Sequence, residues 1–203
     1  MIHSFRLILR KKESVDRMKE EREQETTLQL GVVQKVVPIG IGTRVCIDTA
    51  DILTPTEGVL VGNTGHGYML VLSENRSTDT YPPRPFRINA GGIHQYIYLR
   101  GKTSYLSEMR GGGTLYVYNG THVKEVPIGR VKMEKRELVR VEMETDGVHI
   151  SSTLQYADSV SFLEKDGTIV SVKELSEGTE IYCCIDEPGR HLGEKIKEEI
   201  REY

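Results

Sequence analysis

The sequence contains no tryptophan, only three cysteines and no long apolar run. Its longest apolar stretches, 59–61 and 68–72, are far below the roughly 18 residues that a membrane-spanning helix requires. The run 5–10 is too short for the apolar part of a signal peptide, and its positive charges follow the apolar residues instead of preceding them. We therefore expect a cytoplasmic protein without a membrane partner.

Cysteine and histidine spacing also limits the chemistry. Three cysteines cannot all pair, and Cys183 and Cys184 are adjacent in a predicted strand, where neighbouring side chains point to opposite faces. A Cys-x-x-Cys spacing is absent, and the six histidines show no His-x-x-x-His spacing. The sequence therefore predicts no disulfide framework and no metal site, with Cys46 and Cys183 as small core residues.

Charge of neither sign is in large excess. Lysine and arginine total 27 against 30 aspartates and glutamates, which gives a formal net charge of −3. The global basic surplus that drives binding to phosphate backbones is lacking, so nucleic acid is not expected as a partner. With 28% charged and 37% hydrophobic residues among 203, the composition is that of a globular protein with one large or two small domains.

What the sequence does contain is a series of short β-branched runs, separated by Gly, Pro, Asn and Asp turns, from residue 28 to residue 184. This pattern is typical of mainly β folds. It predicts small antiparallel β-barrel or sandwich modules that pack together. We assign residues 28–203 to one β-rich region.

Helices are predicted only near the two ends. Residues 1–27 are expected to form an N-terminal strand and a charged connector, with a short helix at about 12–24. A second helix is expected at about 191–202, because four apolar residues share one helical face. These residues are Leu192, Ile196, Ile200 and Tyr203.

The proline-rich segment before Gly91 is the first candidate binding site. Arg84 and Arg87 lie beside three prolines at 82, 83 and 85, which fix the local backbone. Arginine forks suit a carboxylate or phosphate, and the backbone of Gly91 and Gly92 can approach the same ligand closely. A stiff surface loop with solvated arginines is the alternative.

A predicted strand at 129–136 carries the second group of charged residues. Strand alternation places Arg130, Lys132, Glu134 and Arg136 on one face. This face is either a solvated outer surface or one wall of a cleft for an anionic substrate.

Three further segments contain candidate residues. Lys102 and Glu108 follow Gly101 in a stretch that is not a phosphate loop, because the first glycine of that motif is missing, and a capping or turn role is the alternative. Arg190 and His191 stand where the last helix is predicted to begin, and the positive end of a helix favours anions. The glycine-rich segment 62–67 is predicted as a hairpin loop and does not match the dinucleotide fingerprint.

Several of these segments occur together in one known order. They read RVCIDTADILTPTEGVLVGNTGHGYMLVLSEN, RPFRINAGGIHQYIYLRGKTSYLSE, GRVKMEKREL, TLQYADSV and GRHLGEKI. Over about residues 28–202 the chain resembles the 3-dehydroquinate synthase II family. The resemblance implies NAD-dependent oxidative deamination of 2-amino-3,7-dideoxy-D-threo-hept-6-ulosonate, a small anionic amino sugar acid, and its cyclisation to 3-dehydroquinate in aromatic amino acid biosynthesis.

The resemblance also implies a set of site residues. The matching positions are Glu74, Arg84, Arg87, Asn89, His94, Lys102, Tyr105, Glu108, Arg130, Lys132, Glu134, Gln155, Arg190 and His191. We expect substrate binding from Glu74, Arg84, Arg87, Asn89, Arg130 and Arg190, with Arg84 and Arg87 clamping the carboxylate. Catalytic roles are expected for His94, Lys102, Lys132, Glu134 and His191. We expect His94 or His191 to transfer protons during cyclisation, and Lys132 or Lys102 to stabilise the developing enolate charge.

Family members carry an additional N-terminal α/β portion, and the sequence shows no dinucleotide fingerprint. The residues that bind NAD are therefore unknown, and a separate α/β chain is one conceivable partner.

Two further interpretations stay open. The resemblance also permits a related cyclase of the aminohydroxybenzoate synthase kind, which would use a divalent metal. A non-catalytic β module that binds an anion or a partner is the third possibility.

Overall fold

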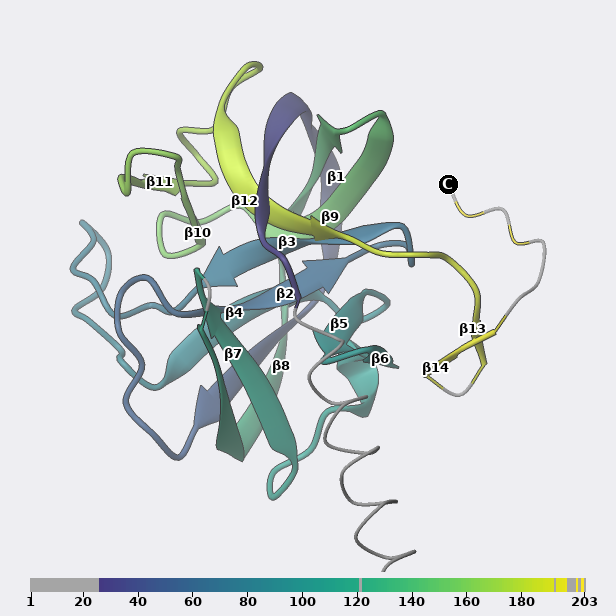
Figure 1. Ribbon diagram of the computed structural model, residues 1–203. Helices are drawn as coiled ribbons and strands as arrows, with labels where there is room; N and C mark the ends of the chain where they lie inside the picture. Colours follow the sequence, from purple (N-terminus) through teal and green to yellow (C-terminus); the bar gives the residue numbers. More distant parts are fainter. Residues whose placement is uncertain (1–25, 121, 192, 197–199, 201, 203) are drawn as a thin grey trace, which may run out of the picture.

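The structure is a computed structural model that describes residues 26–120, 122–191, 193–196, 200 and 202. It is mainly β, as predicted, and ten antiparallel strands form its principal sheet (Figure 1). These strands are β1 (Gln29–Thr49), β2 (Gly58–Gly62), β3 (Gly67–Leu72), β4 (Arg87–Gly92), β5 (Tyr96–Leu99), β6 (Lys102–Tyr105), β7 (Thr114–Asn119), β8 (His122–Thr145), β9 (Val148–Gln155) and β12 (Glu180–Ile185).

Short elements complete the described part of the chain. The strands β10 (Ser161–Leu163) and β11 (Ile169–Ser171) form one two-stranded sheet, and β13 (Arg190–His191) and β14 (Glu194–Lys195) form another. A single turn of 3-10 helix, η1 (Leu106–Glu108), follows β6. Within the described residues, no helix is long and apolar enough to cross a membrane.

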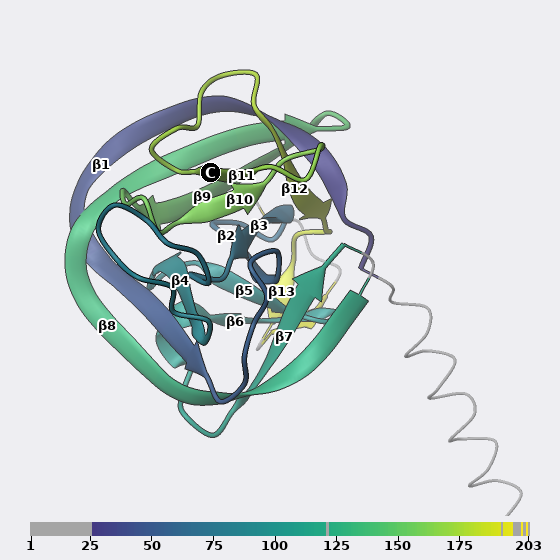
Figure 2. The same ribbon diagram turned by 90° about the vertical axis from the view of Figure 1, so that its left-hand side faces the viewer.

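Two very long strands organise the sheet. β1 has 21 residues and β8 has 24, and they pair with each other from Val32 opposite Glu144 to Thr49 opposite Ile128. Shifts of register, including one between Pro38 and Gly40, interrupt the ladder and let the strands bend. Figure 2 shows the two strands curving together around one side of the molecule.

The remaining strands join the outer edges of this pair. β12 and β4 pair with opposite ends of β1, while β7 and β9 pair with opposite ends of β8. The strand path returns on itself, because β2 pairs with both β7 and β3, and β3 pairs with β12. One consequence matters for the site: β4, β1 and β8 are consecutive neighbours.

The core lies on the inner surface of the curved sheet. Ile47, Leu53, Ile88 and Phe162 are among its fully buried members. Each such side chain contributes about 1.5–3 kcal/mol relative to an exposed position. A smaller cluster contains Tyr68, Tyr98 and Tyr118. Cys46 and Cys183 are buried, as expected, and Cys184 is buried as well; all three cysteines are free. Burial raises the pKa of the Cys183 thiol to about 12, so it stays protonated.

The predicted helix at 191–202 is wrong at its start, where β13 and β14 form a small antiparallel ladder. Gly189 and Gly193 have φ values of 101° and 83°, which belong to the left-handed region and not to a right-handed helix. Turn chemistry therefore overrides the helical spacing of the apolar residues. The helix predicted at 12–24 lies outside the described residues.

The prediction of small β-barrel or sandwich modules that pack together also needs correction. The strand predicted at 129–136 is only the middle part of the much longer strand β8. The residues that follow it up to Thr145 include no glycine or proline, so the strand continues through them. The molecule is thus organised by one continuous ten-stranded sheet and does not form a clear barrel.

Candidate functional site

The central feature of the candidate site is the polar end of β1. Alternation places Arg44, Cys46 and Asp48 on one face of the strand. The ladder sets Asp48 directly opposite Arg87 of β4 on one side and Arg130 of β8 on the other. A buried carboxylate therefore stands between two arginines from neighbouring strands.

Asp48 is fully engaged by these arginines. Arg87 donates from Nε to Oδ1 at 2.7 Å and from a terminal nitrogen to Oδ2 at 2.9 Å, and Arg130 Nε donates to Oδ2 at 2.9 Å. Asp48 is only 5% exposed. Burial acts to raise its pKa, but the hydrogen bonds from Arg87 and Arg130 outweigh this effect and hold the pKa below its ordinary value. Asp48 is consequently an ionised anchor that orients both arginines.

Glu134 of β8 is the second anchor of the network. It contacts Arg44 at 2.6 Å and both Lys132 and Arg136 at 3.0 Å. The hydrogen bond from Lys132 is the main reason that the pKa of Glu134 lies below its ordinary value. Arg44 also contacts the Sγ atom of Cys46 through its guanidinium. This carboxylate thus collects three cations at one point of the surface.

Glu74 differs from the other two carboxylates. It follows β3 and is fixed by backbone hydrogen bonds, because its N–H donates to the Arg87 carbonyl and its own carbonyl accepts from the Arg84 N–H, both at 2.8 Å. The Arg84 guanidinium lies 2.7 Å from Glu74 Oε2. Burial raises the pKa of Glu74 above its ordinary value despite this cation. A buried carboxyl with raised proton affinity suits general acid–base chemistry.

We call this network the ion-pair face. It consists of Arg44, Asp48, Glu74, Arg84, Arg87, Arg130, Lys132, Glu134 and Arg136. Six cations thus surround three carboxylates, a surplus of three positive charges. The cations on β8 form its outer layer, since the side chains of Arg130, Lys132 and Arg136 are 63%, 46% and 41% exposed. Such a surface attracts an anionic ligand.

Unsatisfied polar atoms lie within and beside the ion-pair face. The Nε atoms of Arg44 and Arg84 and the Oδ1 atom of Asn89 are buried, and none has a hydrogen-bond partner among the described residues. Asn89 of β4 stands opposite Cys46 of β1, and its amide nitrogen donates a hydrogen bond to Gln155 Oε1 at 2.9 Å. Buried polar atoms normally find partners, so a ligand or water at this face would satisfy them.

The structure thus brings together six of the predicted site residues: Glu74, Arg84, Arg87, Arg130, Lys132 and Glu134. Asn89 lies next to them. The structure also places Asp48 and Arg44 in this network, and neither was among the predicted site residues. Their alternation with Cys46 was visible in the sequence, but only the strand register shows that Asp48 stands between two arginines.

Other predicted residues lie elsewhere. His94 contacts Asn63 Oδ1 through Nε2 at 3.1 Å, and burial, then the charge of Arg140, keeps its pKa below the ordinary value. Lys102 pairs with Glu194 at 2.5 Å on an exposed surface.

The short helix η1 accounts for two more of the predicted positions. Glu108 accepts a hydrogen bond from the Tyr105 N–H at 2.9 Å, so it caps η1. The side chains of Arg190 and His191 are outside what the structure describes.

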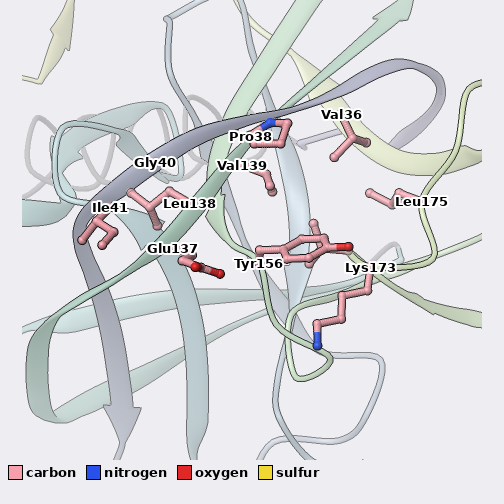
Figure 3. A pocket seen from close by; sticks show the side chains of 11 residues that line it. Val36, Pro38, Gly40, Ile41, Glu137, Leu138, Val139, Tyr156, Lys173 and Leu175 are labelled. Carbon is pink, nitrogen blue, oxygen red and sulfur yellow. The ribbon is translucent and has the colours of Figure 1, made fainter.

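An apolar groove of about 560 Å³ lies on another part of the molecule. Figure 3 shows Val36, Leu138 and Leu175 along it, with the ring of Tyr156 and the side chain of Lys173 nearby. The groove contains none of the predicted site residues. It is therefore separate from the ion-pair face.

Fit to a cofactor can be tested on the described residues. The loop 62–67 joins β2 to β3 in an antiparallel hairpin, and no helix follows it. The strand–turn–helix unit that binds a dinucleotide pyrophosphate is therefore not present in the described part of the chain, and these residues do not fit NAD in that way. Likewise, among the described residues no group of three or more His, Cys, Asp or Glu side chains gathers as a metal site.

Comparison with known families decides which family this β-rich chain represents. Residues 30–203 match the family model described as 3-dehydroquinate synthase II C-terminal domain. The chain belongs to the 3-dehydroquinate synthase II family. The resemblance seen in the sequence is therefore confirmed.

Individual members of the 3-dehydroquinate synthase II family are similar over nearly the whole chain. The 3-dehydroquinate synthase of Methanosarcina barkeri is 37% identical over 192 residues, which cover 94% of this chain and 50% of the relative. That of Archaeoglobus fulgidus is 40% identical over 187 residues, or 91% and 57%. A 3-dehydroquinate synthase homolog of Aquifex aeolicus is 38% identical over 184 residues, or 90% and 56%.

The chain thus spans about half the length of the curated relatives it matches. No solved structure matches it significantly.

Proposed function

We propose that this chain takes part in the NAD-dependent oxidative deamination of 2-amino-3,7-dideoxy-D-threo-hept-6-ulosonate and its cyclisation to 3-dehydroquinate. Membership of the 3-dehydroquinate synthase II family and the names of the relatives support an enzyme of this kind. The observation that carries the proposal is the surplus of cations on the ion-pair face, since the substrate is a carboxylate.

The substrate carboxylate binds to the outer cations of this face. Arg130 and Lys132 are exposed and lie on the same side of β8, and the partly exposed Arg84 has a buried Nε without a partner among the described residues. Arg87 is held in a bidentate pair with Asp48, so its role is to fix the anchor rather than to clamp the ligand. This arrangement revises the expected pair of Arg84 and Arg87.

Ring closure requires a proton transfer that the face can perform. After oxidative deamination has converted C2 to a ketone, cyclisation forms a bond from C7 to the carbonyl carbon C2, while C7 loses a proton and the C2 oxygen gains one. Glu74 takes the C7 proton, because its raised pKa makes it a better base than Asp48 or Glu134. Lys132 stabilises the enolate oxygen at C6 with its ammonium group.

In the oxidative step NAD would accept the hydride from C2, and water would hydrolyse the resulting C2 imine to the ketone with release of ammonia. The described residues do not contain the strand–turn–helix unit that binds a dinucleotide pyrophosphate, so no step through NAD is assigned to them. We propose that a separate α/β portion, of the kind that family members carry, contributes the cofactor site. The metal-dependent alternative is not favoured, because the relatives are named as 3-dehydroquinate synthases.

Charge-removing substitutions on β8 test the binding step. Lys132→Gln and Arg130→Gln should each weaken substrate binding to the 203-residue chain about tenfold, as expected for one lost charge-assisted hydrogen bond. Calorimetry with the amino sugar acid measures the effect.

Lys135→Gln is the matched control, because Lys135 is exposed on the same strand and alternation places it on the opposite face. If Lys135→Gln weakens binding as much as Lys132→Gln, or if both β8 variants bind like the wild type, the ion-pair face is not the substrate site.

A further inference from the structure

A second cavity, of about 530 Å³, is built from residues outside the ion-pair face. It lies where the loop between β2 and β3 meets β8 and β9. Its lining includes Thr64, His66, Arg140, His149, Ser151 and Glu202. We call it the histidine pocket. Its volume is in the range typical of small-molecule sites, and neither the family resemblance nor the predicted site residues assign it a role.

The carboxylate of Glu202 already lies in the histidine pocket, and we call the two groups that bind it the seat. The backbone N–H of Gly65 donates to Glu202 Oε2 at 2.7 Å, and the hydroxyl of Tyr96 donates to Glu202 Oε1 at 3.3 Å. The two donors come from different elements and reach both oxygens of one carboxylate. The seat is closely fitted, since a Cβ atom at position 65 would lie 3.4 Å from Glu202 Oε2 and 3.1 Å from Pro188 Cα.

Additional donors surround this seat. Arg140 uses Nε to donate to Glu142 Oε1 at 3.0 Å, while its terminal nitrogens make no hydrogen bond within the described residues. His66 contacts Thr64 through Nδ1 at 3.2 Å, which leaves Nε2 for another partner. Ser151 Oγ accepts a hydrogen bond from the Asn63 amide at 3.1 Å and keeps its own proton to donate.

We propose that the histidine pocket binds a small hydroxycarboxylate from solution. The ligand carboxylate takes the place of Glu202 on Gly65 and Tyr96, while its hydroxyl bonds to His66 or Arg140. Glu202 then acts as an internal competitor, because a tethered carboxylate has an effective concentration in the millimolar range. This inference does not rest on the proposed function, since it uses other residues and another ligand.

Titration with lactate, and with uncharged lactamide as the matched ligand, tests the proposal on the full chain. Binding is followed by NMR at the Gly65 amide and the His66 ring. Glu202→Gln should bind lactate about tenfold more tightly than the wild type, because the competing charge is gone. Lactamide should bind neither protein measurably.

Three control variants separate the alternatives. Glu194→Gln changes a carboxylate on the same C-terminal segment that pairs with Lys102 on the surface, so it should leave lactate affinity unchanged. Arg140→Gln in the Glu202→Gln background should weaken lactate binding, with an unchanged methyl spectrum as the folding control. Lys132→Gln should have no effect, which distinguishes this pocket from the ion-pair face.

Several outcomes would overturn the proposal. Equal lactate affinity in the wild type and Glu202→Gln, or no binding by either, would mean that Glu202 only ties the end of the chain to the loop. Equal binding of lactamide would show that the pocket does not recognise a carboxylate. Loss of lactate binding in Lys132→Gln would assign the signal to the ion-pair face.

Discussion

Asp48 accepts hydrogen bonds from two arginines while it is almost completely buried, and this makes it the residue on which the ion-pair face depends. Asp48→Asn would leave the largely buried Arg87 without its counter-charge. We expect a loss of about 3 kcal/mol in the free energy of unfolding, as for the removal of one member of a buried pair. Urea unfolding at pH 7 measures it.

The exposed Asp79 provides the control for this substitution. Asp79→Asn should change the free energy of unfolding by less than about 0.5 kcal/mol, as is usual at the surface. A similar cost for both substitutions would mean that Asp48 does not act through its arginine pairs.

The same residue predicts a dependence of stability on pH. The pKa of Asp48 is lower in the folded protein than in the unfolded chain, so its stabilising effect is present above the unfolded pKa of about 4 and is lost as the pH falls through the folded pKa. The stability difference between the wild type and Asp48→Asn should therefore shrink from pH 7 to pH 3. Urea titrations across this range would contradict the prediction if the difference stayed constant.

Five charged members of the ion-pair face could be selected from residue patterns, because they stand at alternate positions of a predicted strand or beside prolines: Arg84, Arg87, Arg130, Lys132 and Glu134. Glu74 was selected only through the family resemblance. Asp48 was missed for a physical reason. Its partners come from β4 and β8, and a ladder register that shifts at bulges fixes which residues stand opposite each other. Such pairings across strands leave no local pattern in the sequence.

At the scale of elements, the C-terminal segment shows how turn glycines decide structure. Gly193 lies in the left-handed region, and its carbonyl accepts a hydrogen bond from the Thr103 N–H at 3.0 Å. A Cβ atom at this position would overlap the Thr103 carbonyl oxygen. Gly193→Ala should therefore detach the β13–β14 ladder from β6 and speed hydrogen exchange at the Thr103 amide about tenfold or more.

Gly167→Ala is the matched control for this element. Gly167 has a similar φ of 87° in the turn between β10 and β11, but a Cβ atom there meets open space. Gly167→Ala should therefore lose only the stability that alanine costs at a positive φ, and it should leave hydrogen exchange at the Thr103 amide unchanged. Faster exchange at Thr103 in both variants would indicate general destabilisation and not local detachment.

The strands themselves were largely predictable, and their lengths were not. β-branched runs bounded by turn residues predicted a mainly β structure from residue 28 to residue 184, because such runs are local signals, and β2, β3, β7 and β9 are short strands in this region. The strand predicted at 129–136 is shorter than β8, in which charged residues such as Arg136 and Glu137 each have a partner on β1. Pairing with a distant strand therefore extends β8 where the local sequence is neutral.

At the scale of the whole molecule, charge is distributed unevenly. The chain has a formal charge of −3 although the ion-pair face alone carries a surplus of three positive charges. The remainder of the chain is thus distinctly acidic. An anion approaching the protein is attracted to this face more than to the rest of the chain, which favours the encounter that the proposed function requires.

The long ladder between β1 and β8 has a consequence for how the protein is made. Thr49 pairs with Ile128 and Val32 with Glu144, so β1 is synthesised about 80–110 residues before its partner. At about 5–20 residues per second, the ribosome leaves this strand waiting for several seconds with an open edge. Pro38 lacks an N–H group, and the bulges around it disturb the spacing of the other backbone N–H groups of β1. The irregularities that bend β1 in the finished sheet therefore also make the nascent strand a poor template for aggregation.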